Sequence, residues 1–246
     1  MKKHLIFWLC LTILTCVLCV PVSAEEKIDN PNYGNLSDAE IELLIKYMED
    51  NPDFVLDTIP LSISSQTFYF DSEGNRINNM TKGAISPSAM TITIYTGKFY
   101  DPGYDYIKVS ATATWNYAPI FRNKDLFAIA WGGNFAVTSY SCSTYYQTVG
   151  WKSGQSSLIS ATPNSGLGYS VNVNIAQTLE KVTIQADLKK VDSDGVANVV
   201  ATYGHAVVDI GGIGINFSGG EIPSISFSAN LVGVLDTMTK VSYFNY

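Results

Sequence analysis

Hydrophobic and polar positions alternate along most of the chain, but one segment near the N-terminus follows a different period. Its apolar positions recur at spacings of three and four residues, as on one face of a helix: Ile41, Leu44, Ile45 and Met48. Ser37 precedes Glu40 by three residues, the spacing of a capping box in which each side chain binds the other residue's backbone N–H. Asn51-Pro52 is a stop signal. The pattern therefore predicts a helix over Asp38–Asp50.

After Pro60 the period becomes two residues, which is typical of strands with one buried and one exposed face. The longest example is Tyr106–Tyr117. Similar alternation recurs in four other segments: Met90–Ile94, Tyr169–Ile175, Val182–Leu188 and Ile222–Leu231. Leu126–Trp131 is apolar almost throughout, which predicts a central strand covered on both faces. Turn dipeptides separate these segments, and Asp194-Gly195 predicts a hairpin between its two neighbours.

About ten strands of this kind predict an all-β protein. We expect an antiparallel β-sandwich, or an open barrel, of about ten strands with one N-terminal α-helix. The sequence contains no internal repeat and no proline-rich linker between the strands. It therefore predicts three parts: a signal peptide over residues 1–24, an N-terminal arm with the helix over 25–57, and one β domain over 58–246.

The segment 1–24 has the three-part layout of a secretory signal peptide. Lys2 and Lys3 precede an apolar run over Leu5–Val20, and small residues end the segment at Ala24. The apolar run is shorter than the roughly 20 residues that a membrane-spanning helix needs. We therefore expect cleavage after Ala24 and a secreted, extracellular protein.

Composition narrows the chemistry that such a protein can carry. The chain has 246 residues and a net charge of -7, and loss of the signal peptide leaves one histidine, His205, and one cysteine, Cys142. These counts exclude a zinc site with several Cys or His ligands from one chain, and an intramolecular disulfide. An acidic chain without a basic run is a poor nucleic-acid binder. We expect no metal, no cofactor and no nucleic-acid partner.

The lone thiol and the lone imidazole each have a structural and a functional interpretation. Cys142 fits a small buried side chain, but it also fits an intermolecular disulfide or a thiolate nucleophile. His205 fits a polar strand residue bonded to a neighbour, but it also fits a general base. The chain contains no Gly-x-Ser-x-Gly motif. A Cys142/His205 hydrolase is therefore the weaker interpretation, and no enzyme activity is visible in the sequence.

The segment Tyr100–Tyr106 is a candidate binding loop between two strands. It combines aromatic rings and carboxylates, which together can grip a sugar: Tyr100, Asp101, Tyr104 and Asp105. Two carboxylates also allow glycoside hydrolysis at a suitable separation. The structural alternative is an ordinary Pro-Gly turn with tyrosines packed over the strand ends.

The block Trp115–Gly133 contains Pro119 and Arg122, followed three residues later by Asp125. We expect an ion pair between Arg122 and Asp125, and we include Arg122 among the candidate binding residues. This spacing of Trp, Pro, Arg-x-x-Asp and Trp resembles a stretch in uncharacterised secreted proteins of Gram-positive bacteria. The resemblance is confined to this block and implies an exported bacterial protein, with no activity attached.

Together these features favour a secreted, non-catalytic protein that binds a glycan or a cell-surface protein. The alternative is a β-pore-forming or membrane-active protein, since amphipathic strands rich in Ser and Thr can close into a pore after oligomerisation. Leu167–Val191 is our candidate for an inserting hairpin, and Gly211–Leu235 is glycine-rich and apolar. A glycosidase or Cys hydrolase ranks third.

Overall fold

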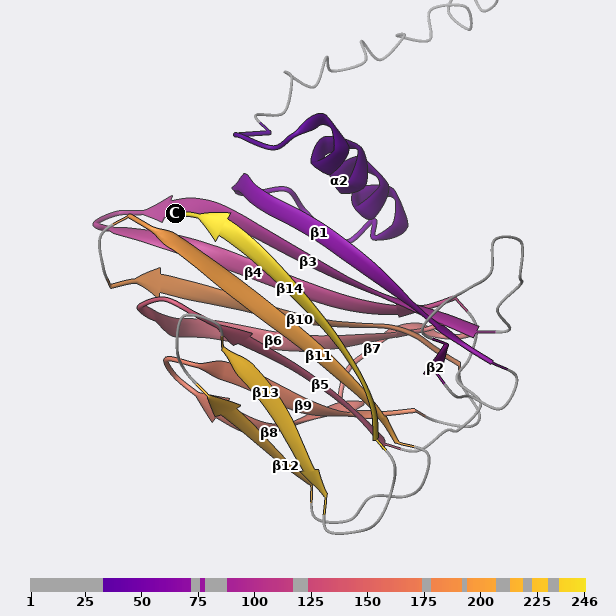
Figure 1. The fold of residues 1–246 in the computed structure, drawn as a ribbon. Coiled ribbons are helices and arrows are strands. Elements are labelled where there is room, and N and C mark those ends of the chain that lie inside the picture. The colour runs from indigo at the N-terminus through magenta and orange to yellow at the C-terminus, as the bar shows by residue number, and fades with distance from the viewer. Residues whose placement is uncertain are drawn as a thin grey trace, which may run out of the picture. The chain divides into compact units, whose positions relative to one another are not determined.

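The structure is a computed structural model that describes residues 33–71, 76–77, 88–116, 124–173, 178–191, 194–206, 213–218, 223–229 and 235–246. These residues form one compact unit. Two antiparallel sheets make up most of it and pack face to face (Figure 1). The prediction of an antiparallel β-sandwich with one N-terminal helix is confirmed.

The larger sheet, called sheet A here, has seven strands. In spatial order they are β2 (Arg76–Ile77), β1 (Ile59–Phe70), β3 (Ser88–Asp101), β4 (Tyr104–Trp115), β10 (Leu179–Lys190), β6 (Phe135–Tyr146) and β7 (Gly150–Lys152). Sheet B has five strands: β14 (Leu235–Asn245), β11 (Val196–Ala206), β5 (Lys124–Trp131), β9 (Gly166–Asn172) and β8 (Ser156–Thr162). A separate hairpin consists of β12 (Ile213–Ser218) and β13 (Ser224–Ala229).

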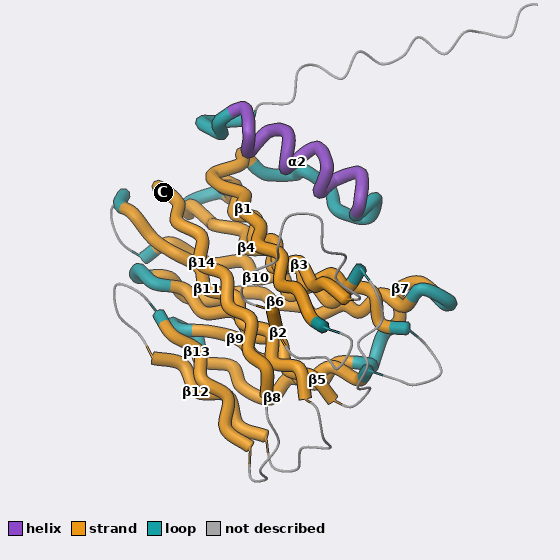
Figure 2. The backbone as a smooth tube through the Cα atoms, turned by 45° about the vertical axis from the view of Figure 1, so that its right-hand side comes forward, coloured by secondary structure: helices purple, strands orange, loops and turns teal. Residues whose placement is uncertain are grey.

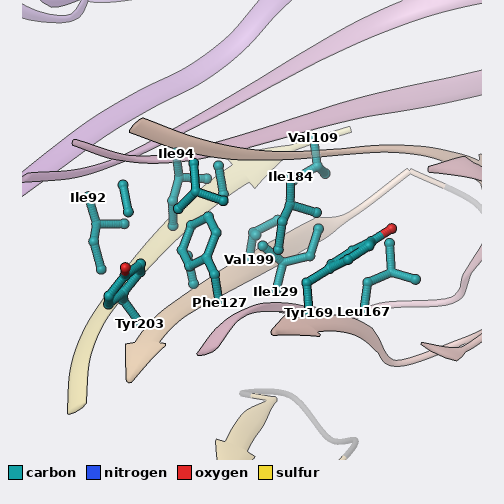
Figure 3. Close-up of a cluster of buried hydrophobic side chains, with 14 of the residues drawn as sticks. Ile92, Ile94, Val109, Phe127, Ile129, Leu167, Tyr169, Ile184, Val199 and Tyr203 are labelled. Carbon is teal, nitrogen blue, oxygen red and sulfur yellow. The ribbon is translucent and has the colours of Figure 1, made fainter. Parts of the chain in front are cut away.

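The core lies between the two sheets, where the inward members of each alternating pattern meet (Figure 3). Sheet A contributes mainly β-branched residues, including Ile92, Ile94, Val109 and Ile184. Sheet B contributes larger rings together with aliphatic residues, including Phe127, Ile129, Leu167, Tyr169, Val199 and Tyr203. The period of two residues in the sequence therefore corresponds to this single buried layer.

Helix α2 (Asp38–Asp50) covers part of the outer face of sheet A (Figure 2). The capping box is present, with the Ser37 N–H donating to the Glu40 carboxylate at 2.9 Å. The buried face centres on Leu44 and Tyr47, while Ile45, which we expected on that face, is 43% exposed. The contact is rotated because the Tyr47 ring reaches the sheet and its hydroxyl bonds there.

Hairpin β12–β13 covers part of the outer face of sheet B, on the opposite side of the sandwich from α2 (Figure 1). It contacts strands β5, β8 and β11. Strand β5 is therefore covered by the core on one face and by the hairpin on the other, and every residue from Asp125 to Trp131 is buried. This confirms the expectation of a central strand covered on both faces.

Two predicted hairpins are wrong. Strands β10 and β11, on either side of Asp194-Gly195, lie in different sheets, so this turn carries the chain from sheet A to sheet B. The same holds for Leu167–Val191, because β9 belongs to sheet B and β10 to sheet A. Turn signals and alternation are local, and they do not specify which of two sheets the next strand joins.

Candidate functional site

The predicted binding loop is the tip of the β3–β4 hairpin. Tyr100 pairs with Asp105, and Asp101 pairs with Tyr104. Residues paired across two strands share a face, whereas adjacent residues point to opposite faces. Tyr100 and Asp105 therefore lie on one face of the tip, and Asp101 and Tyr104 on the other. The two tyrosines are 72% and 51% exposed, respectively.

Local contacts occupy two of these side chains. Asp105 forms a salt bridge of 3.0 Å with Lys98, and the Lys189 ammonium lies 3.1 Å from the centre of the Tyr104 ring. The pairing does not place the two carboxylates on either side of one sugar ring, so the glycosidase interpretation receives no geometric support. Arg122 lies outside the described residues.

His205 belongs to a buried polar cluster that joins both sheets. Its Nδ1 lies 2.9 Å from a carboxylate oxygen of Asp125, and the Tyr203 hydroxyl donates to the same carboxylate at 2.8 Å. The Trp115 indole N–H donates to the Tyr203 hydroxyl at 3.4 Å. Burial first, and then the Asp125 charge, raise the pKa of Tyr203 well above its usual value. Among the described residues no Ser or Cys side chain bonds to His205, and the cluster has the character of a structural anchor.

Cys142 lies on a different sheet from His205. It pairs with Ile184 on β10 and packs against the core between the sheets. Burial raises the pKa of its thiol to about 11, and a hydrogen bond from Ser156 only partly offsets this. A thiol that stays protonated at neutral pH, away from the imidazole, is poorly placed for nucleophilic catalysis.

A concave site lies where the end of α2 meets sheet A, and the sequence analysis did not identify it. This α2 pocket has a volume of about 560 Å³. Its floor is formed by outward side chains of two strands, among them Ser143 of β6 and Thr183 and Gln185 of β10. Its walls include Phe54, from the segment after the helix, and Trp151 of β7.

The walls of the α2 pocket are held by specific contacts. The Trp151 indole N–H donates to the Asp53 carboxylate, and Tyr145 packs edge-on against the indole with ring centres 5.3 Å apart. On the floor, the Tyr47 hydroxyl bonds to Thr112 at 2.7 Å, and Thr112 bonds to Thr183 at 2.9 Å. The indole is thus fixed while it remains 40% exposed.

A second, more polar pocket of about 770 Å³ lies on the other side of Tyr47 and Asn51. Threonines of β1, β3 and β4 line it together with charged residues of α2 and β10.

Among the residues that the structure describes, no group of three His, Cys, Asp or Glu side chains can hold a metal ion. In the same part of the chain, no helix is long and apolar enough to cross a bilayer.

The α2 pocket was missed because its residues come from four separate segments. The only sequence signal is Trp151, an aromatic residue in the polar run Gln147–Gln155. A lone tryptophan in such a run indicates an exposed ring, but nothing nearby in the sequence indicates that Asp53 and Phe54 meet it.

Comparison with known proteins gives no close relative. No family model and no curated protein matches the chain. Among solved structures, the KRT10-binding region domain of the pneumococcal serine-rich repeat protein PsrP matches 58% of this chain and 87% of its own, at 9% identity and a TM-score of 0.31. A structure described as a pore forming protein matches 75% of this chain and 91% of its own, at 7% identity and a TM-score of 0.30. At these scores the matches carry no argument about function.

Proposed function

We propose that this protein is secreted after cleavage at Ala24 and acts outside the cell as a non-catalytic binding protein. The observation that carries the proposal is the α2 pocket, with a fixed and exposed indole above a floor of hydroxyl and amide groups. Its volume lies within the range of about 300–1,000 Å³ that is usual for small-molecule sites. The resemblance to exported Gram-positive proteins agrees with this location.

The ligand class that fits this lining is a neutral glycan. The C–H face of a sugar ring carries partial positive charge and packs against the negative face of an aromatic ring such as Trp151. Sugar hydroxyls find donors and acceptors on Ser143, Thr183 and Gln185. Asp53 and Lys152, both lining the pocket, carry opposite charges, so the pocket has no single-sign field that would favour a highly charged ligand.

The exposed tip of the β3–β4 hairpin is a second candidate surface. Tyr100 and Tyr104 present large exposed rings there, and Asp101 and Asp105 supply carboxylates beside them. Because these rings lie on opposite faces of the tip, they fit a protein partner that wraps around it better than a single sugar. Cell-surface proteins are the partner class for this surface.

Tryptophan fluorescence can test the pocket directly. In residues 25–246 the tryptophans are Trp115, Trp131 and Trp151, and the first two are buried. We expect soluble cell-wall polysaccharide to protect the fluorescence from iodide quenching, because only the exposed indole is accessible to iodide. Trp151→Ala should weaken binding at least tenfold, whereas Trp151→Phe should retain most of it through stacking.

A matched variant separates the two surfaces. Tyr100→Ala combined with Tyr104→Ala should leave polysaccharide binding unchanged and should reduce retention on walls that keep their proteins. Unchanged polysaccharide binding by Trp151→Ala would contradict the pocket proposal. Retention that disappears after protease treatment of the wall would instead assign binding to a protein partner.

A further inference from the structure

Hairpin β12–β13 is an insertion in a hairpin of sheet B. Strands β11 and β14 pair directly, up to Ala206 opposite Leu235. The segment 207–234 lies between these two positions, and its described part is found on the outer face of the sheet instead of in its ladder (Figure 1). The sandwich is therefore complete without this segment.

The hairpin is amphipathic and uncharged along both strands. The residues that face sheet B are apolar: Ile215, Phe217, Ile225 and Phe227. The alternate residues are small or polar, and those that are exposed are Asn216, Ser218, Ser224, Ser226 and Ser228. Cross-strand pairing keeps the two faces separate, since Ile215 lies opposite Phe227 and Phe217 opposite Ile225.

In the part of the chain that the structure describes, the contacts that hold the hairpin on sheet B are apolar. Beneath it, β5 and β9 present small residues, with Ala128 paired to Gly168 and Ala130 to Gly166. A Cβ atom on Gly168 would lie 2.4 Å from Ile215, which shows how closely the hairpin approaches the sheet. Among the described residues no hydrogen bond joins the hairpin to sheet B.

A lipid bilayer can bury the apolar face of this hairpin as sheet B does. Apolar side chains that leave sheet B for lipid remain out of water, and the described residues of the hairpin have no hydrogen bond to sheet B that release would break. A spanning strand needs about 9–11 residues, so two strands and a turn need about 20–25. The segment 207–234 between β11 and β14 is long enough, and only Asp209 and Glu221 within it are charged.

The two ladders can also join. Between the last β11–β14 pair and the first β12–β13 pair there are six residues on one side, 207–212, and five on the other, 230–234. A single one-residue bulge therefore suffices to align β11 with β12 and β13 with β14 in one long hairpin. An isolated hairpin leaves both backbone edges unpaired in lipid, so several chains must close a barrel.

We infer that β12–β13 leaves sheet B and, together with the same hairpin from other copies of this chain, forms a membrane-spanning β-barrel. The apolar face contacts lipid, and the serine-rich face lines a water-filled channel. The inserting segment is this hairpin and not Leu167–Val191, whose two strands belong to different sheets of the core. The inference is independent of ligand binding at the α2 pocket.

A reversible lock tests whether the hairpin must move. A Cβ on Gly168 would lie 3.3 Å from the Cβ of Ile215, near the range of about 3.5–4.5 Å found in disulfides. We therefore design Gly168→Cys with Ile215→Cys, in a Cys142→Ala background, on residues 25–246. Dye release from phosphatidylcholine vesicles, with and without phosphatidylglycerol, should fall at least tenfold in the oxidised form and recover on reduction.

The same molecule serves as its own control, because oxidised and reduced forms share any folding defect. Ile215→Cys alone should respond to neither oxidant nor reductant. Equal dye release by the oxidised and reduced lock would overturn the inference. Absence of release by the unmodified chain from both kinds of vesicle would overturn it as well.

A second, independent experiment measures whether adjacent residues of β13 alternate between lipid and water. Fluorophores are attached to single cysteines at Ile225→Cys and at Ser226→Cys, and nitroxide-labelled lipid serves as the quencher. We expect strong quenching at position 225 and little at position 226, because adjacent strand residues face lipid and channel respectively. Equal quenching at both positions, or none at either, contradicts a spanning strand.

Discussion

The outer faces of the two sheets are both covered, but the two covers are attached differently. Helix α2 combines apolar packing of Leu44 with a hydrogen bond between the hydroxyls of Tyr47 and Thr112 and one from the Lys181 ammonium to the Asp50 carbonyl. Hairpin β12–β13 rests on small residues through apolar contact, without a hydrogen bond to the sheet among the described residues.

Because of this difference, helix α2 is a fixed cover of sheet A, whereas hairpin β12–β13 is a cover of sheet B that can be exchanged. Hydrogen bonds depend on direction and distance, so they hold α2 in one orientation and keep the α2 pocket in shape. Apolar contact has no direction, and any apolar medium can replace it. The fixed cover therefore suits a binding site, and the other suits a segment that changes partner.

The largest effect is expected when a buried side chain is truncated in α2, compared with the same change in β12–β13. Leu44→Ala should lower the free energy of unfolding by about 2–5 kcal/mol, because Leu44 is fully buried against the sheet. Ile215→Ala should leave the main unfolding transition within about 1 kcal/mol and should instead speed amide exchange in β12–β13. Denaturant unfolding and hydrogen exchange measure the two effects. A loss of global stability in Ile215→Ala as large as in Leu44→Ala would show that the hairpin unfolds with the sandwich.

A methyl group beneath the hairpin should act next most strongly. In Gly166→Ala the added Cβ would lie 2.5 Å from the Phe217 ring and 2.6 Å from the Ile129 carbonyl oxygen. We expect a cost of about 1–3 kcal/mol from overpacking, together with faster proteolysis of the hairpin. Gly195→Ala, where the nearest atom lies at 3.3 Å, is the matched control. Unaltered proteolysis of Gly166→Ala would argue against close docking.

Removing one hydroxyl should loosen the helical cover by a smaller amount. Tyr47→Phe loses two hydrogen bonds, one with Thr112 at 2.7 Å and one with Ser110 at 3.5 Å, and Thr112 keeps its bond to Thr183. Because the long bond to the buried Ser110 hydroxyl is lost without another partner to replace it, we expect a cost of about 1–2 kcal/mol, measured by thermal unfolding. Tyr243→Phe, at an exposed position, should cost nothing measurable. A cost above about 3 kcal/mol would mean that polar contacts dominate the attachment of α2.

The smallest effect is expected in the core between the two sheets, where the reactivity of the Cys142 thiol can be measured. Its pKa of about 11 lies two units above the usual value near 9, so its thiolate fraction at pH 8 should be about a hundredfold lower than that of an ordinary thiol. Alkylation should therefore be slow at pH 8 and should accelerate until about pH 11. The raised pKa adds stability below about pH 9 that is lost as the pH rises toward 11.

Release of the hairpin should not alter this thiol, because Cys142 faces the core and not the outer surface of sheet B. Iodoacetamide labelling of Gly166→Ala and of the unmodified chain at pH 8 should give equal rates. Faster labelling in Gly166→Ala would show that the sandwich itself opens when the hairpin is displaced, and would weaken the distinction between the two covers.

Much of the local structure follows from the sequence, because it depends on residues close together in the chain. The capping box of Ser37 and Glu40, the alternation in β4 and the uninterrupted apolar run of β5 each predict their element with bounds close to those observed. The exposure of Tyr100 and Tyr104 likewise follows from their position at a Pro-Gly turn.

The tertiary structure alone decided how these elements combine. Turn residues at 194–195 end one strand and begin another, but the choice between two sheets depends on burial against strands far away in the sequence. The α2 pocket requires Asp53 and Trp151 to meet, and the apolar face of β12–β13 requires a platform of glycine and alanine from other strands. Such contacts form between distant residues, so spacing along the chain carries no signal for them.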